Sequence, residues 1–311
     1  MRILFMGTPD FAVFSLKALV EAGEEVIGVI TQPDKPKGRG YTMTPPPVKV
    51  YAEAEGLPVW QPTTLKDESF SELLSELAPD LIAVVAYGKI LPASVINFPK
   101  YRCVNVHGSL LPEYRGAAPM QRAIIDGKEK TGITTMYMDI GLDTGDMILK
   151  EEIDIELSDN FETIHDKLGL CGANLLVKTV ELIKEGKAPA TPQDSSLATY
   201  AAKIEKSDCL IDFTRTAREI HDLIRGLSPI PLAFTHTPDG KLLKVISAER
   251  DETAGYNAEC GEVVSIENGA ITVACGEGAV RLLAVLPEGK GRMPAADFIR
   301  GRKISKGDIL K

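Results

Sequence analysis

Residues 81–86 read Leu-Ile-Ala-Val-Val-Ala, a run that is apolar at every position. Arg2–Met6 and Glu25–Thr31 before it, and Val104–His107 after it, are similarly rich in apolar or β-branched residues. Such runs are typical of strands that are buried on both faces of a parallel sheet. Segments with the spacing of helices separate them, beginning with Phe11–Ala22. The alternation predicts an α/β domain with a doubly wound, Rossmann-like parallel sheet, which binds its ligands at the carboxyl ends of the strands.

The pattern changes in the second part of the chain. Gly186–Ser196 contains two prolines, an aspartate and two serines, a composition typical of a linker. Further on, one amphipathic helix over Thr216–Arg225 is followed by short apolar runs separated by turn signals, as in a small β-barrel or sandwich. The length of 311 residues corresponds to about two domains. We therefore expect three parts: residues 1–189 as the first domain, 190–206 as a linker, and 207–311 as a smaller C-terminal β-barrel domain.

The composition is that of a folded globular protein with a net charge of −9. This acidic total differs from the basic signature of nucleic-acid binders, but it hides two basic segments, Pro33–Lys49 and Lys290–Lys311. The five cysteines are scattered and form no Cys-x-x-Cys, which favours reduced thiols in a cytosolic protein. The apolar start is too short for a signal peptide or a membrane span. We expect a cytoplasmic protein with no membrane contact.

Several common motifs are absent from the sequence. It has no Gly-x-x-x-x-Gly-Lys-Ser/Thr, no Gly-x-Ser-x-Gly, and only one glycine in Gly7-Thr-Pro-Asp10, where a dinucleotide fingerprint needs three. The histidines and cysteines do not have the spacing of metal ligands, so we expect no metal. The sequence therefore argues against a P-loop NTPase, an NAD-binding protein and a serine hydrolase.

Asn105 and His107 lie at the end of a predicted strand, where open α/β sheets place their chemistry. Residues two apart on a strand project from the same face. An amide beside an imidazole is suited to stabilise a developing oxyanion, and Gly108 lets a ligand approach the backbone. The pair could equally be an ordinary polar strand end, so by itself it leaves both interpretations open.

Two further patches surround this pair. Gly141-Leu-Asp143-Thr-Gly145 places a carboxylate in a glycine-bracketed loop that could return to His107 and orient it, although the same residues also form ordinary turns. Ser109–Pro119 is largely apolar and follows directly on His107. It could be a plain surface connection, but its apolar character favours a wall of a ligand pocket.

Together the patches resemble the folate-dependent formyltransferase family. The resemblance is carried by Asn105-Val-His107 with Ser109-Leu-Leu-Pro112, Tyr114-Arg-Gly-Ala-Ala-Pro119, Gly141-Leu-Asp-Thr-Gly145, Met6-Gly-Thr-Pro-Asp-Phe11 and Thr31–Gly40. It covers nearly the whole chain. The last two segments and the C-terminal domain point to the members of the family that act on methionyl-tRNA.

The resemblance implies a reaction and a site. The reaction is transfer of the formyl group of 10-formyltetrahydrofolate to the α-amino group of initiator methionyl-tRNA, giving N-formylmethionyl-tRNA for translation initiation. It implies three groups of site residues: catalytic Asn105, His107 and Asp143; folate-binding Ser109, Leu110, Leu111 and Pro112; and Arg39 at the tRNA acceptor stem. It also implies an OB-like C-terminal barrel that binds the body of the tRNA, and we expect a monomer.

Two segments depart from the family pattern. Tyr41–Thr44 stands where the family usually has further basic residues, and Ile230 where it commonly has tryptophan. Both bear on contacts with the acceptor rather than on the reaction. Two alternatives stay open: a formyltransferase for the amine of a sugar nucleotide, and a non-catalytic Rossmann-like protein that binds nucleotides or tRNA. The second would leave Asn105, His107 and Asp143 without a role.

Overall fold

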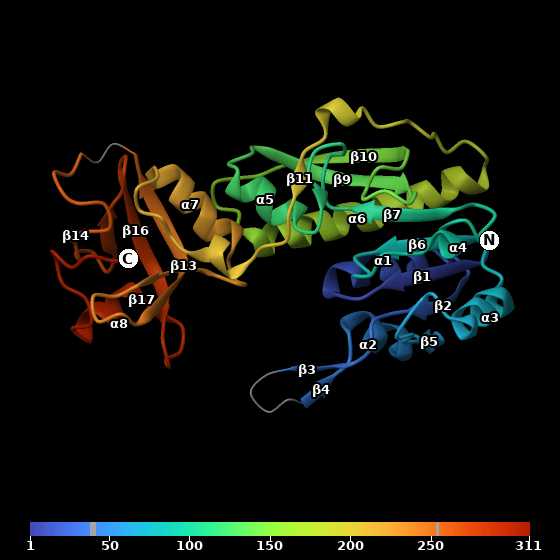
Figure 1. Ribbon diagram of the computed structural model, residues 1–311, viewed down its shortest axis with the longest axis horizontal. Helices are drawn as coiled ribbons and strands as arrows, with labels where there is room; N and C mark the ends of the chain where they lie inside the picture. The colour runs from blue at the N-terminus through green and yellow to red at the C-terminus, as the bar shows by residue number, and fades with distance from the viewer. Residues whose placement is uncertain (38–41, 253–254) are drawn as a thin grey trace. The chain divides into compact units, whose positions relative to one another are not determined.

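The computed structural model describes residues 1–37, 42–252 and 255–311 (Figure 1). The chain divides into two compact units, each assembled from three segments. The first unit consists of Met1–Gly116, Thr131–Ile153 and His165–Ala201; the second consists of Ala117–Lys130, Asp154–Ile164 and Ala202–Lys311. The functional domain boundaries that we expect after residues 189 and 206 stay a prediction.

A seven-stranded sheet forms the centre of the first unit (Figure 1). Its order is β10 (Met147–Asp154), β9 (Lys130–Tyr137), β7 (Cys103–His107), β6 (Leu81–Val85), β1 (Ile3–Gly7), β2 (Val26–Ile30) and β5 (Val59–Trp60). The pairs β7–β6, β6–β1, β1–β2 and β2–β5 are parallel, whereas β9 runs antiparallel to β7. The predicted parallel α/β sheet is confirmed, and the runs that begin at residues 81 and 104 are two of its central strands.

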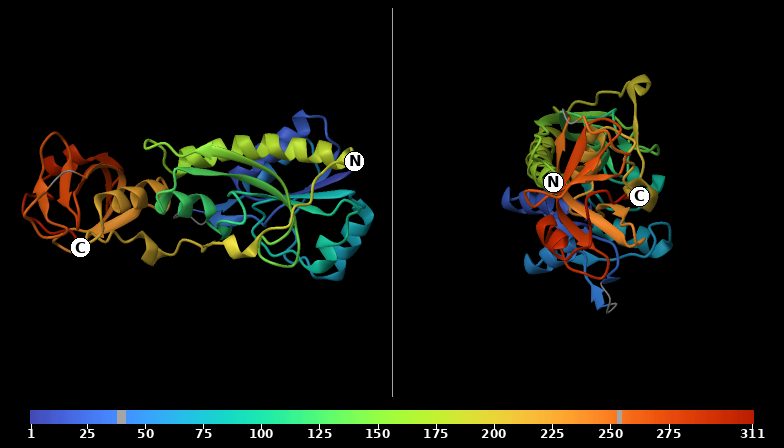
Figure 2. Two further views of the ribbon diagram at one scale, coloured as in Figure 1. Left: turned by 90° about the horizontal axis from the view of Figure 1, so that it is seen from above. Right: turned by 90° about the vertical axis from the view of Figure 1, so that its left-hand side faces the viewer.

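Helices cover both faces of this sheet. They are α1 (Asp10–Glu21), α2 (Pro47–Ala54), α3 (Glu68–Leu77), α4 (Ala93–Ile96) and the long α6 (Phe161–Lys184). On one face, Phe70 and Leu74 of α3 share a buried core with Ile82 and Val84 of β6. α6 covers the other face (Figure 2). It packs so closely there that a Cβ on Gly172 would lie 3.0 Å from Cγ1 of Val106. Coverage on both faces explains why these strands are apolar throughout.

Two short pairings extend from this sheet. β3 (Lys35–Lys37) and β4 (Thr42–Thr44) form an antiparallel hairpin. β8 (Arg115–Gly116) pairs in parallel with β11 (Tyr200–Ala201), which follows a 3₁₀ turn at Ser195–Leu197. The second pairing brings residues from the end of the first unit beside the loop that follows β7.

The second unit contains a curled antiparallel sheet (Figure 1). Its order is β12 (Ala233–His236), β13 (Leu242–Asp251), β16 (Ala279–Pro287), β15 (Ile271–Ala274) and β14 (Val263–Ser265), with β17 (Met293–Pro294) paired to β16. Its helices are α5 (Pro119–Ile125), α7 (Ala217–Gly226), α8 (Ala295–Arg300) and a 3₁₀ turn at Lys206–Cys209. The expected small C-terminal β-domain is confirmed, in the form of a half-closed barrel.

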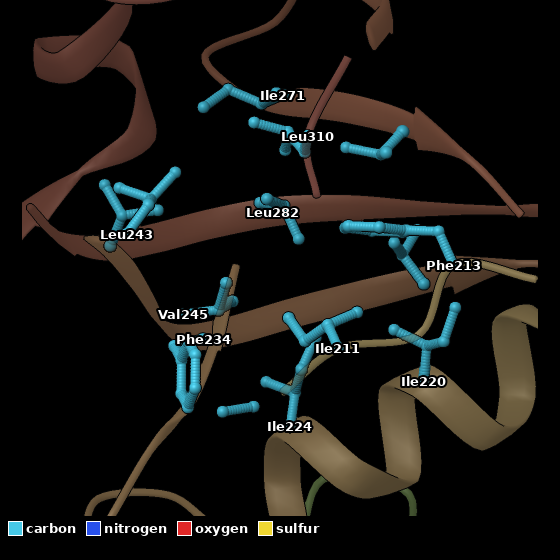
Figure 3. Close-up of a cluster of buried hydrophobic side chains, with 14 of the residues drawn as sticks. Ile211, Phe213, Ile220, Ile224, Phe234, Leu243, Val245, Ile271, Leu282 and Leu310 are labelled. Atoms are coloured by element: carbon cyan, nitrogen blue, oxygen red, sulfur yellow. The ribbon is translucent and has the colours of Figure 1, made fainter. Parts of the chain in front are cut away.

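This sheet and α7 enclose a core of their own (Figure 3). α7 begins with a capping box between Thr216 and Glu219, and its Ile220 and Ile224 are buried in the same cluster as Leu282. Full burial of one such side chain contributes about 1.5–3 kcal/mol to the stability of the fold.

The helices in the described part of the chain are all too short or too polar to span a membrane.

Candidate active site

β7 places Asn105 and His107 between two neighbouring strands. Asn105 is paired with Val84 of β6 on one side and Met136 of β9 on the other, and His107 is paired with Thr134. Backbone pairing on both sides therefore holds this strand end in place. His107 is the last residue of β7, at the carboxyl edge of the parallel strands, where the sequence predicts the site.

The two side chains project from one face, as the alternation of a strand predicts. Val106 between them faces α6, so Asn105 and His107 point to the opposite side of the sheet. His107 is buried and Asn105 is half-buried. In the part of the chain that the structure describes, the Asn105 amide has no hydrogen-bond partner, which leaves it available to a ligand.

The hydrogen bonds of His107 assign the roles of its two ring nitrogens. Nε2 lies 3.0 Å from the carbonyl oxygen of Tyr114. A carbonyl only accepts, so Nε2 carries a proton and donates it. Nδ1 lies 3.7 Å from Oδ2 of Asp143, an ion-pair distance rather than a hydrogen bond. The carboxylate of Asp143 therefore faces the second ring nitrogen.

Asp143 lies in a loop whose shape depends on glycine. The residue itself has φ +53°, and its Oδ2 accepts a hydrogen bond of 2.9 Å from the backbone N–H of Gly116. A Cβ on Gly145 would lie 1.8 Å from the carbonyl oxygen of Tyr137, which no side chain could tolerate. The glycine after Asp143 thus permits the close approach that turns the carboxylate toward His107.

Two residues that we did not single out, Arg115 and Gln193, complete this network. Nε2 of Gln193 donates to the carbonyl oxygens of Asp143 and Gly145, each at 2.8 Å. Oε1 of Gln193 accepts from Nε and Nη2 of the buried Arg115, at 3.1 and 2.8 Å. In the sequence Arg115 stands out only as part of a family motif. No sequence signal marks Gln193, because its partners lie 48 to 78 residues away along the chain.

The predicted folate loop is divided between inward and outward side chains. Ser109 is buried and donates to the carbonyl oxygen of Glu113 at 2.6 Å. Leu111 is fully buried with Met136 and Met147. Leu110 and Pro112 are partly exposed. A ligand on this surface would therefore contact Leu110, Pro112 and the backbone rather than the side chains of Ser109 and Leu111.

Exposed apolar side chains lie close to Asp143 in the sequence, which is unusual for a surface loop. Ile140 is 84% exposed and Leu142 is 60% exposed. Ile90, in the loop that follows β6, is 89% exposed. Sequence reasoning missed all three, because an apolar residue in a loop gives no sign of whether it is buried.

The tRNA-binding residue that we expect, Arg39, lies outside the described residues. Nearby in the sequence, Lys49 of α2 forms an ion pair of 3.0 Å with Asp34 and also donates to Gln61. Hydrogen bonds from Gln61 and Lys49 lower the pKa of Asp34, so its carboxylate stays charged. Lys49 is thus neutralised within the protein and adds no free charge to the basic segment Pro33–Lys49.

Another aromatic residue near this edge, Tyr87, follows β6 and is buried in the core of the sheet. Burial raises the pKa of its hydroxyl to about 12, so the group is neutral at physiological pH.

No group of three or more His, Cys, Asp or Glu side chains suited to a metal ion occurs among residues 1–37, 42–252 and 255–311.

Comparisons with known proteins agree with this geometry. Residues 1–180 match the family model described as formyl transferase, and residues 203–303 match the formyl transferase C-terminal domain. The chain is 50% identical over 310 residues to the methionyl-tRNA formyltransferase of Pelotomaculum thermopropionicum, covering 100% of this chain and 98% of that protein. It is 49% identical over 310 residues to the enzyme of that name from Bacillus subtilis, covering 99% and 97%.

Solved structures share the fold at low sequence identity. An N-formyltransferase from Helicobacter canadensis, in complex with folinic acid and dTDP-3-aminofucose, has a TM-score of 0.68 and 20% identity, covering 90% of this chain and 98% of that one. HypX from Aquifex aeolicus, in complex with tetrahydrofolic acid, has a TM-score of 0.65 and 18% identity, covering 96% and 47%. At these identities the likeness extends to the fold alone.

Proposed function

The chain belongs to the formyl transferase family, and on that basis we propose that it transfers the formyl group of 10-formyltetrahydrofolate to the α-amino group of methionyl-tRNA. The product would be N-formylmethionyl-tRNA, for translation initiation. The observation that carries the proposal is the high identity, over the whole chain, to relatives named methionyl-tRNA formyltransferase. The juxtaposition of His107 and Asp143 beside Asn105 supplies the groups that such a reaction needs.

The neutral amine nitrogen attacks the formyl carbon, and the carbonyl oxygen becomes an oxyanion. We assign the free amide of Asn105 as one hydrogen-bond donor to this oxyanion. His107 is the second donor: its Nδ1 lies 3.7 Å from Oδ2 of Asp143, outside hydrogen-bond distance, so an N–H at this nitrogen would be available to the oxyanion. Donors that stabilise a developing oxyanion contribute about 10²–10³ in rate.

The tetrahedral intermediate then loses the folate nitrogen. The C–N bond to the folate breaks, that nitrogen takes up a proton, and the carbonyl re-forms on the new amide. Asp143 orients His107 and helps remove the proton from the attacking amine. The carboxylate is held for this role by the Gly116 amide, at 2.9 Å. The chain's own residues thus provide electrostatic stabilisation and proton transfer.

The folate would lie along the partly exposed Leu110 and Pro112, and the exposed Ile140 and Leu142 of the Asp143 loop would add apolar surface. A flat heterocycle and its aromatic extension bind well to apolar side chains of this kind. Arg39 and the basic segment Lys290–Lys311 would contact phosphates of the tRNA. Binding through the second domain should then weaken as salt is added.

We carry three further expectations within this proposal. The protein would act in the cytoplasm as a monomer, and residues 1–189 and 207–311 would form its catalytic and tRNA-binding domains around the linker 190–206. A molar mass close to 33.6 kDa in light scattering supports the monomer, and twice that mass contradicts it.

A formylation assay with methionyl-tRNA and 10-formyltetrahydrofolate tests the reaction, and His107→Ala serves as the control. We expect transfer by the wild type and a loss of about a hundredfold or more in the variant. Transfer to a sugar-nucleotide amine, with none to methionyl-tRNA, would decide for the other acceptor class. Binding of tRNA without any transfer would favour the non-catalytic alternative.

A further inference from the structure

The segment Thr191–Ala201, here named the strap, runs along both catalytic loops. Thr191 exchanges two backbone hydrogen bonds with Met147, at 2.8 and 2.9 Å. Thr199 accepts at its backbone oxygen from the N–H of Arg115, at 2.9 Å, and at Oγ1 from the N–H of Tyr114, at 2.8 Å. The strap therefore contacts the loop after β7 and the chain just beyond the Asp143 loop.

Gln193 is the strap residue that reaches the Asp143 loop itself. The Nε2 amino group of Gln193 donates to the carbonyl oxygens of both Asp143 and Gly145, so this one side chain bridges the loop. Its oxygen is held by two N–H groups of Arg115. Arg115 is only 2% exposed, so this hydrogen bond to a charged group is shielded from water and geometrically restricted.

The same few atoms also hold His107. Tyr114 supplies the carbonyl that orients Nε2 of His107, and Thr199 fixes the neighbouring N–H of Tyr114. Gly116, directly after Arg115, binds the Asp143 carboxylate. The chain Gln193–Arg115–Gly116–Asp143 is thus a closed ring of contacts, in which the side chain of Gln193 is the only member contributed by the strap.

From this ring we infer that Gln193 is a positioning residue for the reaction: it holds the Asp143 carboxylate at its distance from His107 without touching either substrate. The inference rests on the proposed formyl transfer. A displacement of about 1 Å at a catalytic group can reduce turnover by about a hundredfold. Gln193→Ala removes all four hydrogen bonds of this side chain, so the carbonyl oxygens of Asp143 and Gly145 lose the donor that ties them to Arg115.

The test compares Gln193→Ala with Gln193→Glu and Asp194→Ala. We expect Gln193→Ala to lower kcat by about 10- to 100-fold, with KM for methionyl-tRNA and for the folate within about threefold of wild type. Gln193→Glu keeps an acceptor for Arg115 but replaces the two N–H donors by a carboxylate oxygen that faces two carbonyl oxygens. Its kcat should therefore be no higher than that of Gln193→Ala. Asp194 only caps the exposed turn at Ser196, so Asp194→Ala should leave kcat unchanged.

A double variant separates positioning from a general effect on folding. If Gln193 acts through Asp143, then Gln193→Ala combined with Asp143→Ala loses no more activity than Asp143→Ala alone. A further tenfold loss in the double variant would overturn the inference. So would wild-type kcat in Gln193→Ala, full rescue by Gln193→Glu, or an equal loss in Asp194→Ala.

Hydrogen exchange gives a readout that needs no substrate. Amides of residues 141–145 should exchange faster in Gln193→Ala than in the wild type, while those of β7 stay protected. Unchanged exchange in the loop contradicts the inference even if the reaction is correctly assigned. Conversely, a wild type that formylates no acceptor contradicts the proposed function, while faster loop exchange would still show that Gln193 holds the loop.

Discussion

Nδ1 of His107 and Oδ2 of Asp143 are 3.7 Å apart, yet the two residues are held in place by different means. His107 ends a strand that is paired on both sides and backed by α6. Asp143 sits in a loop with a left-handed backbone, fixed by the Gly116 amide and by Gln193. One residue is positioned by main chain and core packing, the other by side chains from distant segments. The site therefore has a half fixed by main-chain pairing, here named the rigid half, and a half fixed by side-chain contacts, here named the adjustable half.

In both halves, removal of the catalytic side chain should give the largest loss of turnover. We expect His107→Ala to lower turnover by about 10²–10⁴-fold. Asp143→Asn should lower it by about a hundredfold, because the amide can still accept from Gly116 but no longer places a negative charge beside Nδ1 of His107. Both are measured as single-turnover rates. Near-normal rates in both variants would remove the catalytic assignment.

Asn105→Ala should have the next largest effect. It removes one oxyanion donor from the rigid half, so turnover should fall by about a hundredfold with little change in thermal stability. Asn105 has no protein partner to lose within the described chain, so the melting temperature should stay close to that of the wild type. A large drop in melting temperature, with turnover preserved, would instead make Asn105 a structural residue.

A matched pair of glycine substitutions separates the two halves. Gly145→Ala must displace the Asp143 loop, since its Cβ would overlap the carbonyl of Tyr137, and we expect kcat to fall by about tenfold or more. Gly172→Ala presses on Val106 behind β7, but alanine also favours the helix, so stability should change by no more than about 1 kcal/mol while kcat is retained. Unfolding curves and initial rates of both variants check this. The reverse pattern would contradict the division.

Thr199→Val should give the smallest effect. It removes the hydroxyl that accepts from the Tyr114 N–H and keeps the side chain close in size; because this hydrogen bond is only partly buried, its loss should cost about 0.5–1.5 kcal/mol. Because β7 holds His107 independently, kcat should fall by no more than about threefold. Thr199→Ser retains the hydroxyl and serves as the control. A loss as large as that of Gln193→Ala would mean that the rigid half also depends on the strap.

Much of the fold could be predicted because it depends on local patterns. The strands at Leu81–Val85 and Cys103–His107 are apolar runs, and α7 begins at a capping box that is legible in Thr216-x-x-Glu219. The shared face of Asn105 and His107 follows from alternation alone. The second sheet is also marked by its turn signals, although the extent to which it closes depends on pairings between strands far apart in sequence.

The remainder of the site depends on contacts that no local pattern encodes. Lys49 counts as a free basic residue in the sequence, but Asp34, 15 residues earlier, neutralises it. Ser109 and Leu111 belong to the predicted folate loop, yet they face the interior. Gln193 lies in a segment whose composition is that of a linker, and it gains its place only when β8 pairs with β11.

Local sequence patterns were sufficient to predict a parallel α/β sheet, a small β-domain after it, and a strand end shared by Asn105 and His107. Periodicity and strand ends are properties of neighbouring residues, so they can be read directly. The folded chain was needed to see which nitrogen of His107 faces Asp143, and that Arg115 and Gln193 hold the loop that carries Asp143. These are directional contacts between segments far apart along the chain, and they exist only once the backbone has brought those segments together.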